Sequence, residues 1–312
     1  MTNSHKAFTL IELIVALGIS AAIGFFAINI AIGVSDVWSV AEDRSIESVE
    51  TQFALDLLAQ DLESAFFRES PNPMFAVSVL DDASNSGRWI DASSFARPIT
   101  PDPFNPGIDQ YGWAGCWLRF FTAAPGLNAV GYQFIRTPIV GSSNTIRYNL
   151  YRGVVRMDHT LTTGYDIEAA AYSTAGTPTL GNPVEVVSPR VENIILSNVI
   201  DFGIRLYVYD STAPETDDAP PGMRIIFPAN GLNQISNTDD EHSANTGFGL
   251  TYGSRFPEAA EVVIRVLSES GWEQLELVEE EGGTAAEWQR IVEENSSVYR
   301  RFVDMRSRSF SG

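Results

Sequence analysis

The feature that most constrains this 312-residue chain is an apolar run close to its start. Residues 13–34 read LIVALGISAAIGFFAINIAIGV, without a charged side chain and with Asn29 as the one amide. At about 1.5 Å of rise per residue, a helix of this length spans roughly 33 Å, which is enough for the hydrocarbon core of a bilayer. The run therefore predicts a membrane-spanning helix. A secretory signal peptide is the alternative, although its apolar core normally covers only about 7 to 15 residues.

Charge divides the chain into an apolar part and an acidic part. Forty acidic and twenty basic side chains give a formal net charge of −20. Before Asp36 the only charged side chains are Lys6 and Glu12, so residues 36–312 carry all of it. Such a surface repels phosphate backbones, and we expect no nucleic-acid partner. Lys6 precedes the apolar run and acidic residues follow it, which predicts a cytoplasmic N-terminus and an extracytoplasmic acidic part.

The helical pattern continues beyond the apolar run. Apolar residues recur there at steps of three, four or five residues, and the predicted stripe consists of Ile46, Val49, Phe53, Leu57, Leu62 and Phe66. Residues 70–73 read SPNP, where the prolines stop a helix. We therefore expect one helix from about Phe8 to Phe67, apolar all round in its first half and amphipathic in its second.

After Pro73 the pattern is that of strands. Short segments rich in β-branched and aromatic residues alternate with clusters of Gly, Pro, Asn and Ser. The predicted strands are AVSVL, CWLRFF, GYQFIR, TIRYNLYRGVV, NVIDFGIRLYVYD, MRIIF and AEVVIRVL. No long helical pattern separates them, which favours antiparallel pairing. Residues 210–222, with four acids and three prolines, predict a mobile insertion.

A last helix is predicted near the C-terminus. Thr284 and Glu287 have the spacing of a capping box. Trp288, Ile291, Tyr299 and Phe302 then predict one helical face, and Arg300, Arg301, Arg306 and Arg308 would complement the negative end of that helix. The expected fold class is α+β, with a long N-terminal helix packed on a mainly antiparallel, β-rich head. The expected divisions are 1–7, a leader; 8–35, the transmembrane helix; 36–70, an amphipathic stem; 71–283, the head; and 284–312, a C-terminal helix and tail.

Signals for catalysis or metal binding are weak. The three histidines are scattered, and the chain contains neither a G-x-S-x-G elbow nor a P-loop. The run TDDEH at 238–242 has oxygen ligands but not the spacing of a calcium loop, so a solvated charge cluster is the better interpretation. Cys116 is the only cysteine, which excludes an intramolecular disulfide. We expect no enzyme activity and no cofactor, and calcium is unsupported.

Glu12 stands out because a carboxylate within an apolar stretch costs up to about 3.5 kcal/mol at the bilayer centre, although less near an interface. Without a functional role, Glu12 would be an acid near the membrane interface whose side chain reaches the lipid headgroups. The short leader MTNSHKA, the junction between Ala7 and Phe8 and the sequence FTLIE resemble the processing signal of type IV prepilins. This family comprises type IV pilins and the pseudopilins of type II secretion.

The resemblance implies a role for each matched residue. The prepilin peptidase would cleave between Ala7 and Phe8 and methylate the new amine of Phe8. Glu12 would pair with the terminal amine of a neighbouring subunit during assembly, which is sensible because a buried acid is tolerated when a cation meets it. The chain departs from the family at Ala7, where glycine is usual, and in lacking the proline found midway along the helix of major pilins.

The size, the long helix and the β-rich head resemble the J-type minor pseudopilins or W-type minor pilins, with a weaker likeness to prepilin-like proteins of the Verru_Chthon cassette group. The implied function is that of a minor subunit at or near the tip of a pseudopilus or pilus. Its partners would be prepilin peptidase, other pilin or pseudopilin subunits and inner-membrane lipid, with the head in the periplasm before assembly into the filament. Two alternatives remain: a membrane-anchored adhesin or carbohydrate-binding protein, supported by the aromatic segment QYGWAGCWLRFF, and an extracytoplasmic hydrolase on an uncleaved anchor.

Overall fold

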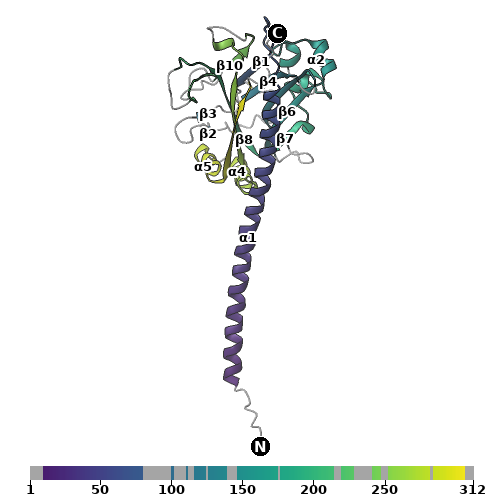
Figure 1. Cartoon of the computed structure of the whole chain (residues 1–312). Coiled ribbons are helices and arrows are strands. Elements are labelled where there is room, and N and C mark those ends of the chain that lie inside the picture. The colour runs from purple at the N-terminus through teal and green to yellow at the C-terminus, as the bar shows by residue number, and fades with distance from the viewer. Residues whose placement is uncertain are drawn as a thin grey trace, which may run out of the picture. The chain divides into compact units, whose positions relative to one another are not determined.

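The computed structural model describes most of the chain, from the first helix to the last strand (Figure 1). The described residues are 10–79, 100–101, 110–111, 116–123, 126–138, 146–174, 176–213, 219–227, 241–246, 252–281 and 284–305. The chain divides into two compact units, Met1–Ser48 and Val49–Gly312. Helix α1 (Leu10–Glu63) contributes residues to both units, and each unit is described by itself.

The second unit contains two large antiparallel sheets. The first sheet has six strands in the order β10-β1-β4-β5-β6-β7, and the second has four in the order β12-β11-β8-β9. The strands of the first sheet are β1 (Phe75–Val79), β4 (Cys116–Thr122), β5 (Asn128–Pro138), β6 (Ile146–Val155), β7 (Ile194–Ser197) and β10 (Glu241–Ala244). Those of the second are β8 (Val199–Tyr209), β9 (Met223–Phe227), β11 (Ala259–Leu267) and β12 (Ser296–Asp304). A further pair consists of β2 (Thr100–Pro101) and β3 (Gln110–Tyr111).

The predicted strands and their antiparallel pairing are confirmed. Each of the seven segments chosen from the sequence coincides with one strand of the two large sheets, as the bounds above show. The α+β class is confirmed as well, with an apolar helix at the N-terminal end and antiparallel sheets after it.

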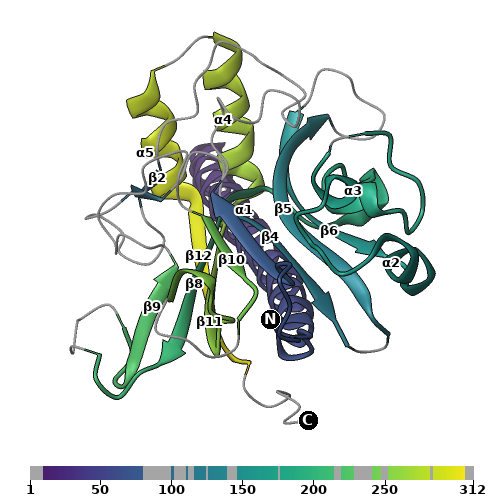
Figure 2. The ribbon, with the colours of Figure 1, turned by 90° about the horizontal axis from the view of Figure 1, so that it is seen from above.

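The C-terminal turns of α1 share one hydrophobic core with both sheets (Figure 2). The helix contributes Ala54, Leu55, Leu58, Ala59 and Leu62, each at most 5% exposed. Because these positions recur at three- and four-residue steps, they form one face of the helix. The predicted stripe was mostly on the wrong face: Val49 and Phe53 are 66% and 64% exposed, whereas Leu62 lies in the core.

The other face of the six-stranded sheet has a separate core. Helices α2 (Met157–Thr163) and α3 (Ala170–Ser173) lie beside strands β5 and β6 (Figure 2). Tyr172 of α3 and Val186 of the 3₁₀ segment η1 (Pro183–Val186) belong to this second core, and a further 3₁₀ segment is η2 (Val191–Asn193). Segment η1 approaches the strands at Gly131 and Gly153, where an added Cβ would lie 3.0 Å and 2.1 Å from its nearest atoms. These two glycines allow the segment to cover the sheet.

The first helix ends earlier than predicted. It stops at Glu63 instead of Phe67, because the next residues pair with strand β4. Ala65 forms an isolated bridge with Thr122, and the amide of Phe66 donates to the carbonyl of Phe121 at 2.7 Å. The placement of Phe66 on the helical stripe was therefore wrong.

The predicted C-terminal helix is also corrected. Thr284 and Glu287 do form the capping box, and helix α5 (Ala285–Asn295) buries Trp288 and Ile291 as expected. The chain then enters β12, so the placement of Tyr299 and Phe302 on a helical face was wrong.

Arg300 and Arg301 likewise lie on this strand and not at a helix end, whereas Arg306 and Arg308 lie outside the described residues. A helix that the sequence analysis did not identify, α4 (Glu269–Glu281), packs beside α5 (Figure 2). It includes the acids 279–281, and a last short 3₁₀ turn is η4 (Tyr252–Ser254).

Candidate functional site

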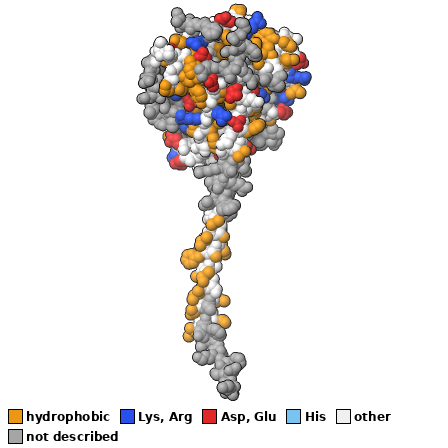
Figure 3. All heavy atoms as spheres, in the orientation of Figure 1, with side chains coloured by type: hydrophobic (Ala, Val, Ile, Leu, Met, Phe, Trp, Pro, Cys, Tyr) orange, Lys and Arg blue, Asp and Glu red, His pale blue; other side chains and the backbone are white. Residues whose placement is uncertain are grey.

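The first unit presents a continuous apolar surface. Residues Leu13–Val34 form a helical segment long and apolar enough to cross a membrane, and none of its most apolar window is buried within the structure. Large aliphatic and aromatic side chains, among them Leu17, Phe25 and Phe26, are each more than 60% exposed. Figure 3 shows this surface as a run of apolar side chains without charged groups among the described atoms. Water is an unfavourable environment for such a surface, whereas lipid tails or other apolar helices are suitable ones.

The residues predicted for processing and assembly cannot be placed by side-chain geometry. Ala7 and Phe8 lie outside the described residues. Glu12 belongs to α1, but its side chain is likewise outside the described part of the chain. Cleavage at Ala7, methylation of Phe8 and pairing of Glu12 therefore stay predictions.

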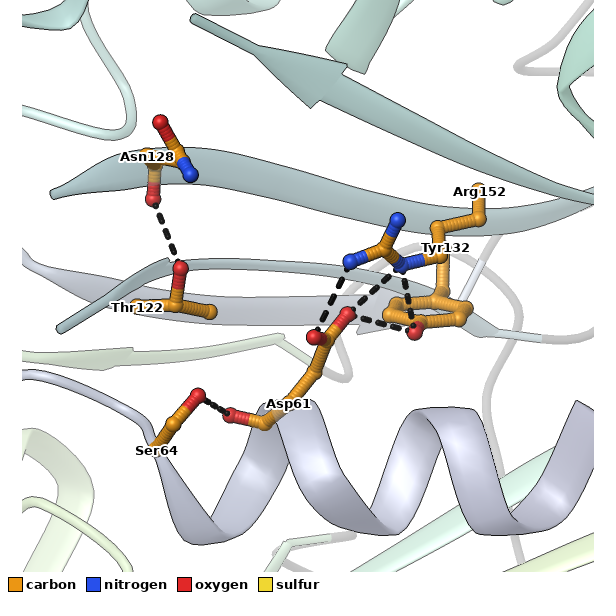
Figure 4. Close-up of polar contacts among 6 residues, drawn as sticks. All are labelled: Asp61, Ser64, Thr122, Asn128, Tyr132 and Arg152. Atoms are coloured by element: carbon orange, nitrogen blue, oxygen red, sulfur yellow. Dashed lines mark hydrogen bonds and ion pairs between the residues drawn. The ribbon is translucent and has the colours of Figure 1, made fainter. Parts of the chain in front are cut away.

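A second carboxylate on the same helix has a defined environment. Asp61, in the last turn of α1, contacts Arg152 of β6 and Tyr132 of β5 (Figure 4). The Arg152 guanidinium donates from Nε to Asp61 Oδ2 at 2.7 Å and from Nη2 to Asp61 Oδ1 at 3.0 Å. The Tyr132 hydroxyl donates to Asp61 Oδ2 at 2.6 Å and accepts from Arg152 Nε at 3.1 Å. We call these three residues the Asp61 cluster.

Burial makes the Asp61 cluster energetically important. The Asp61 side chain is 8% exposed, that of Arg152 is 24% exposed, and Tyr132 is fully buried. Desolvation, followed by the charge of Asp61, holds the pKa of the Tyr132 hydroxyl well above its usual range, so this hydroxyl stays protonated as a donor. Desolvation opposes the charge of Arg152, but its hydrogen bond to Asp61 and the nearby charges outweigh this and raise its pKa. The cluster is a bidentate, charge-assisted contact with a fixed geometry.

The end of α1 is held next to this cluster. The Ser64 hydroxyl donates to the carbonyl of Asp61 at 2.9 Å, and the amide of Ala123 donates to the carbonyl of Ser64 at 2.8 Å. Figure 4 also shows Thr122, whose hydroxyl donates to the Asn128 carbonyl at 3.5 Å where β4 turns into β5. The last helical turn is thus attached to the six-stranded sheet by backbone and side-chain contacts together.

The sequence contained a signal for the Asp61 cluster that its analysis did not use. Asp61 lies seven residues after Ala54 and three after Leu58, and therefore on the buried face of the helix. Arg152 continues the alternation of Tyr148 and Leu150, which point into the core. Two opposite charges at inward positions, one on the helix and one on the strand, suggested an ion pair. Whether the two side chains meet depends on the strand register.

Other polar groups give no support for catalysis. Among the described residues, no group of three or more His, Cys, Asp or Glu side chains could hold a metal ion. The calcium candidate at 238–242 is described only at Glu241 and His242, both on β10. His242 is 1% exposed and its Nε2 lies 2.8 Å from the Arg255 carbonyl, so its assignment to a solvated cluster was wrong. Asp210, the first residue of the predicted mobile insertion, is held by Arg224 and Tyr252 at 2.8 Å each.

The described side chains of the aromatic segment proposed for an adhesin belong to the core. Every residue of β4 is buried, and the Trp117 indole donates to the Val186 carbonyl at 3.0 Å. Arg119 lies over the Trp117 ring, 3.6 Å from its centre. Residues 112–115 and the side chains of Gln110 and Tyr111 lie outside the described part of the chain.

Comparison with known proteins gives no relative: no family model, no curated protein and no solved structure matches the chain.

Proposed function

We propose that the chain is a minor pilin or pseudopilin subunit, anchored in the inner membrane by α1 before it is assembled at or near the tip of a filament. The observation that carries the proposal is the sequence AFTLIEL, which leads directly into an exposed apolar helix. The antiparallel β-rich unit into which the same helix continues supports it, since this is the architecture expected from the resemblance.

In this proposal the two ends of α1 have different tasks. Cleavage before Phe8 would expose an amine at the start of the apolar segment, and Glu12 would pair with such an amine on a neighbouring subunit. The other end, at Asp61, holds the helix in its own folded unit by contacts within one chain. During assembly, the helices of neighbouring subunits would replace lipid around the apolar segment, while the second unit keeps its fold.

The J-type or W-type assignment and the position at the filament tip rest on size and architecture alone. The proposed orientation places the N-terminus in the cytoplasm and the acidic second unit in the periplasm, because Lys6 precedes the apolar run and the acids follow it. An acidic surface also favours contacts with proteins over contacts with nucleic acid.

The deciding experiment is the intact mass and N-terminal fragmentation spectrum of the protein purified from its native membrane. A chain that begins with methylated Phe8 is the expected result. A chain that begins at Met1 refutes processing, and one that begins after Ser20 identifies a signal peptide instead. The variant Phe8→Ala, compared with Phe53→Ala at an exposed position of α1, distinguishes loss of the processing site from a general loss of expression.

A further inference from the structure

Asn29 is the feature of the apolar segment that lipid cannot satisfy. Its amide Nδ2 donates to the Phe25 carbonyl, one turn earlier, at 2.9 Å, and the residue is exposed. An amide has two N–H donors and an oxygen that accepts twice, so most of its capacity is unused by this contact. Asn29 is five residues before Val34, about 7.5 Å inside the end of the apolar segment by helical rise. Its short side chain is surrounded at that depth by groups that form no hydrogen bonds.

From this geometry we infer that α1 associates with a second copy of itself in the membrane through the face that carries Asn29. Every copy is inserted in the same orientation, so its Asn29 lies at the same depth in each. Two such amides facing each other across a twofold axis supply one donor and one acceptor each, which makes the contact self-complementary. No other residue in the span except Ser20 has a polar side chain, so a shift in register loses the pair.

The face that carries Asn29 combines small residues with Phe25, which lies one turn before Asn29 and is 65% exposed. Gly18, Ala22 and Gly33 are separated from Asn29 by 11, 7 and 4 residues, close to three, two and one helical turns. A Cβ added at Gly18 or Gly33 would meet nothing within 4 Å, so the backbone is accessible at these two positions. Small residues around a polar one are typical of interhelical contacts in membranes. Ala27, two residues from Asn29, lies on the opposite face.

The inference rests on the membrane anchoring in the proposed function, but not on cleavage or filament assembly. The test uses the purified full chain in phosphatidylcholine vesicles, with two matched variants, Ala22→Cys and Ala27→Cys. Copper-catalysed oxidation then forms a disulfide between copies wherever two introduced thiols meet. The native Cys116 is fully buried in the second unit and therefore does not compete.

Ala22→Cys is expected to give covalent dimers, and Ala27→Cys at least about fivefold fewer. Adding Asn29→Leu to Ala22→Cys is expected to weaken the dimer about tenfold, since two interhelical hydrogen bonds are lost, while Asn29→Gln retains it. Equal yields from the two cysteine positions, or a yield unaffected by Asn29→Leu, would overturn the inference. In native membranes, an adduct with a different protein in place of the dimer would overturn it too.

Extraction of the vesicles with alkaline carbonate separates this inference from the proposed function. A chain that is released by carbonate is not membrane-spanning, and the anchoring proposal fails with it. A chain that stays in the membrane but gives no Ala22→Cys dimer refutes self-association alone.

Discussion

Replacing Arg152 by Met is expected to lower the free energy of unfolding of the second unit by about 3 kcal/mol. The substitution leaves the Asp61 carboxylate, 8% exposed, with Tyr132 as its remaining side-chain donor. Removing one partner of a buried ion pair costs about 3 to 5 kcal/mol. The lower value applies because Arg152 is itself 24% exposed and the Tyr132 hydroxyl stays in place.

The double variant Asp61→Leu/Arg152→Met tests the same reasoning from the other side. It removes both charges, so no unpaired charge stays buried. Its loss of unfolding free energy should therefore be about 2 kcal/mol smaller than the sum of the losses in the two single variants. The measurement is a urea titration of the full chain in detergent micelles, followed by tryptophan fluorescence. Trp272 and Trp288 are buried in the second unit and report its unfolding.

Arg301→Met is the matched control. Arg301 lies on β12 and pairs with Asp56 of α1 at 3.3 Å, but the two side chains are 51% and 65% exposed. An exposed pair of this kind contributes less than about 1 kcal/mol. If Arg152→Met costs no more than Arg301→Met, the Asp61 cluster does not hold the helix end and the argument from burial is wrong.

Three further predictions concern other parts of the chain. Gly153→Ala should destabilise the second unit by about 3 kcal/mol in the same titration, because its Cβ would lie 2.1 Å from the Glu185 carbonyl oxygen. Burial lowers the pKa of His242 below its ordinary value of 6.5, although its contact with the Arg255 carbonyl opposes this. The unfolded chain therefore binds the proton first as the pH falls, and stability is lost from about pH 6.5 down to the folded pKa, by at most about 1.4 kcal/mol per pH unit. Glu12→Ala should leave the urea midpoint unchanged but prevent incorporation into a filament, measured as subunit in sheared filament fractions.

Each of these has a control in the chain. Gly253→Ala should be tolerated, since no atom lies within 4 Å of its added Cβ. His242→Gln should remove the pH-dependent part of the stability, whereas the exposed His159→Gln should keep it. Glu50→Ala, an exposed acid on the same helix as Glu12, should assemble normally. Normal assembly of Glu12→Ala would contradict the role proposed for that residue.

The strands were predictable because their own residues determine them. Residues with a high strand propensity predominate in β6 and β8, and β8 is buried at every position except its last. The C-terminal error has a physical cause. SSVYRRFVD follows a well-capped helix, and its apolar residues also fit helical spacing, but pairing with β11 over nine residues gives it strand structure. Helix α4 had a signal in Trp272, Leu275 and Val278, spaced three residues apart, and in Ser268, whose hydroxyl accepts from the Gly271 amide at 3.2 Å.

The Asp61 cluster was less predictable than any strand. Asp61 and Arg152 are separated by 91 residues, and their contact depends on the end of α1 and the register of β5 with β6 together. Local preferences determine neither of these. A charge on a buried face indicates that a partner exists, but the three-dimensional structure identifies which one.

The same reasoning, applied to Glu12, gives a different answer. Asp61 finds its cation within its own folded unit, so its loss should appear as a loss of stability. Within residues 1–48, the bases are Lys6 and Arg44 apart from the histidine at position 5, and Arg44 is 32 residues from Glu12, about 48 Å along a helix. Cleavage after Ala7 would remove Lys6 and His5 and leave the Phe8 amine as the nearest cation, at the start of the apolar segment. Such an amine can come from the same chain or from a neighbour. Mixed assembly of Glu12→Ala with wild-type subunits distinguishes the two, because pairing between chains lets the variant's own amine still meet a wild-type Glu12, whereas pairing within one chain does not.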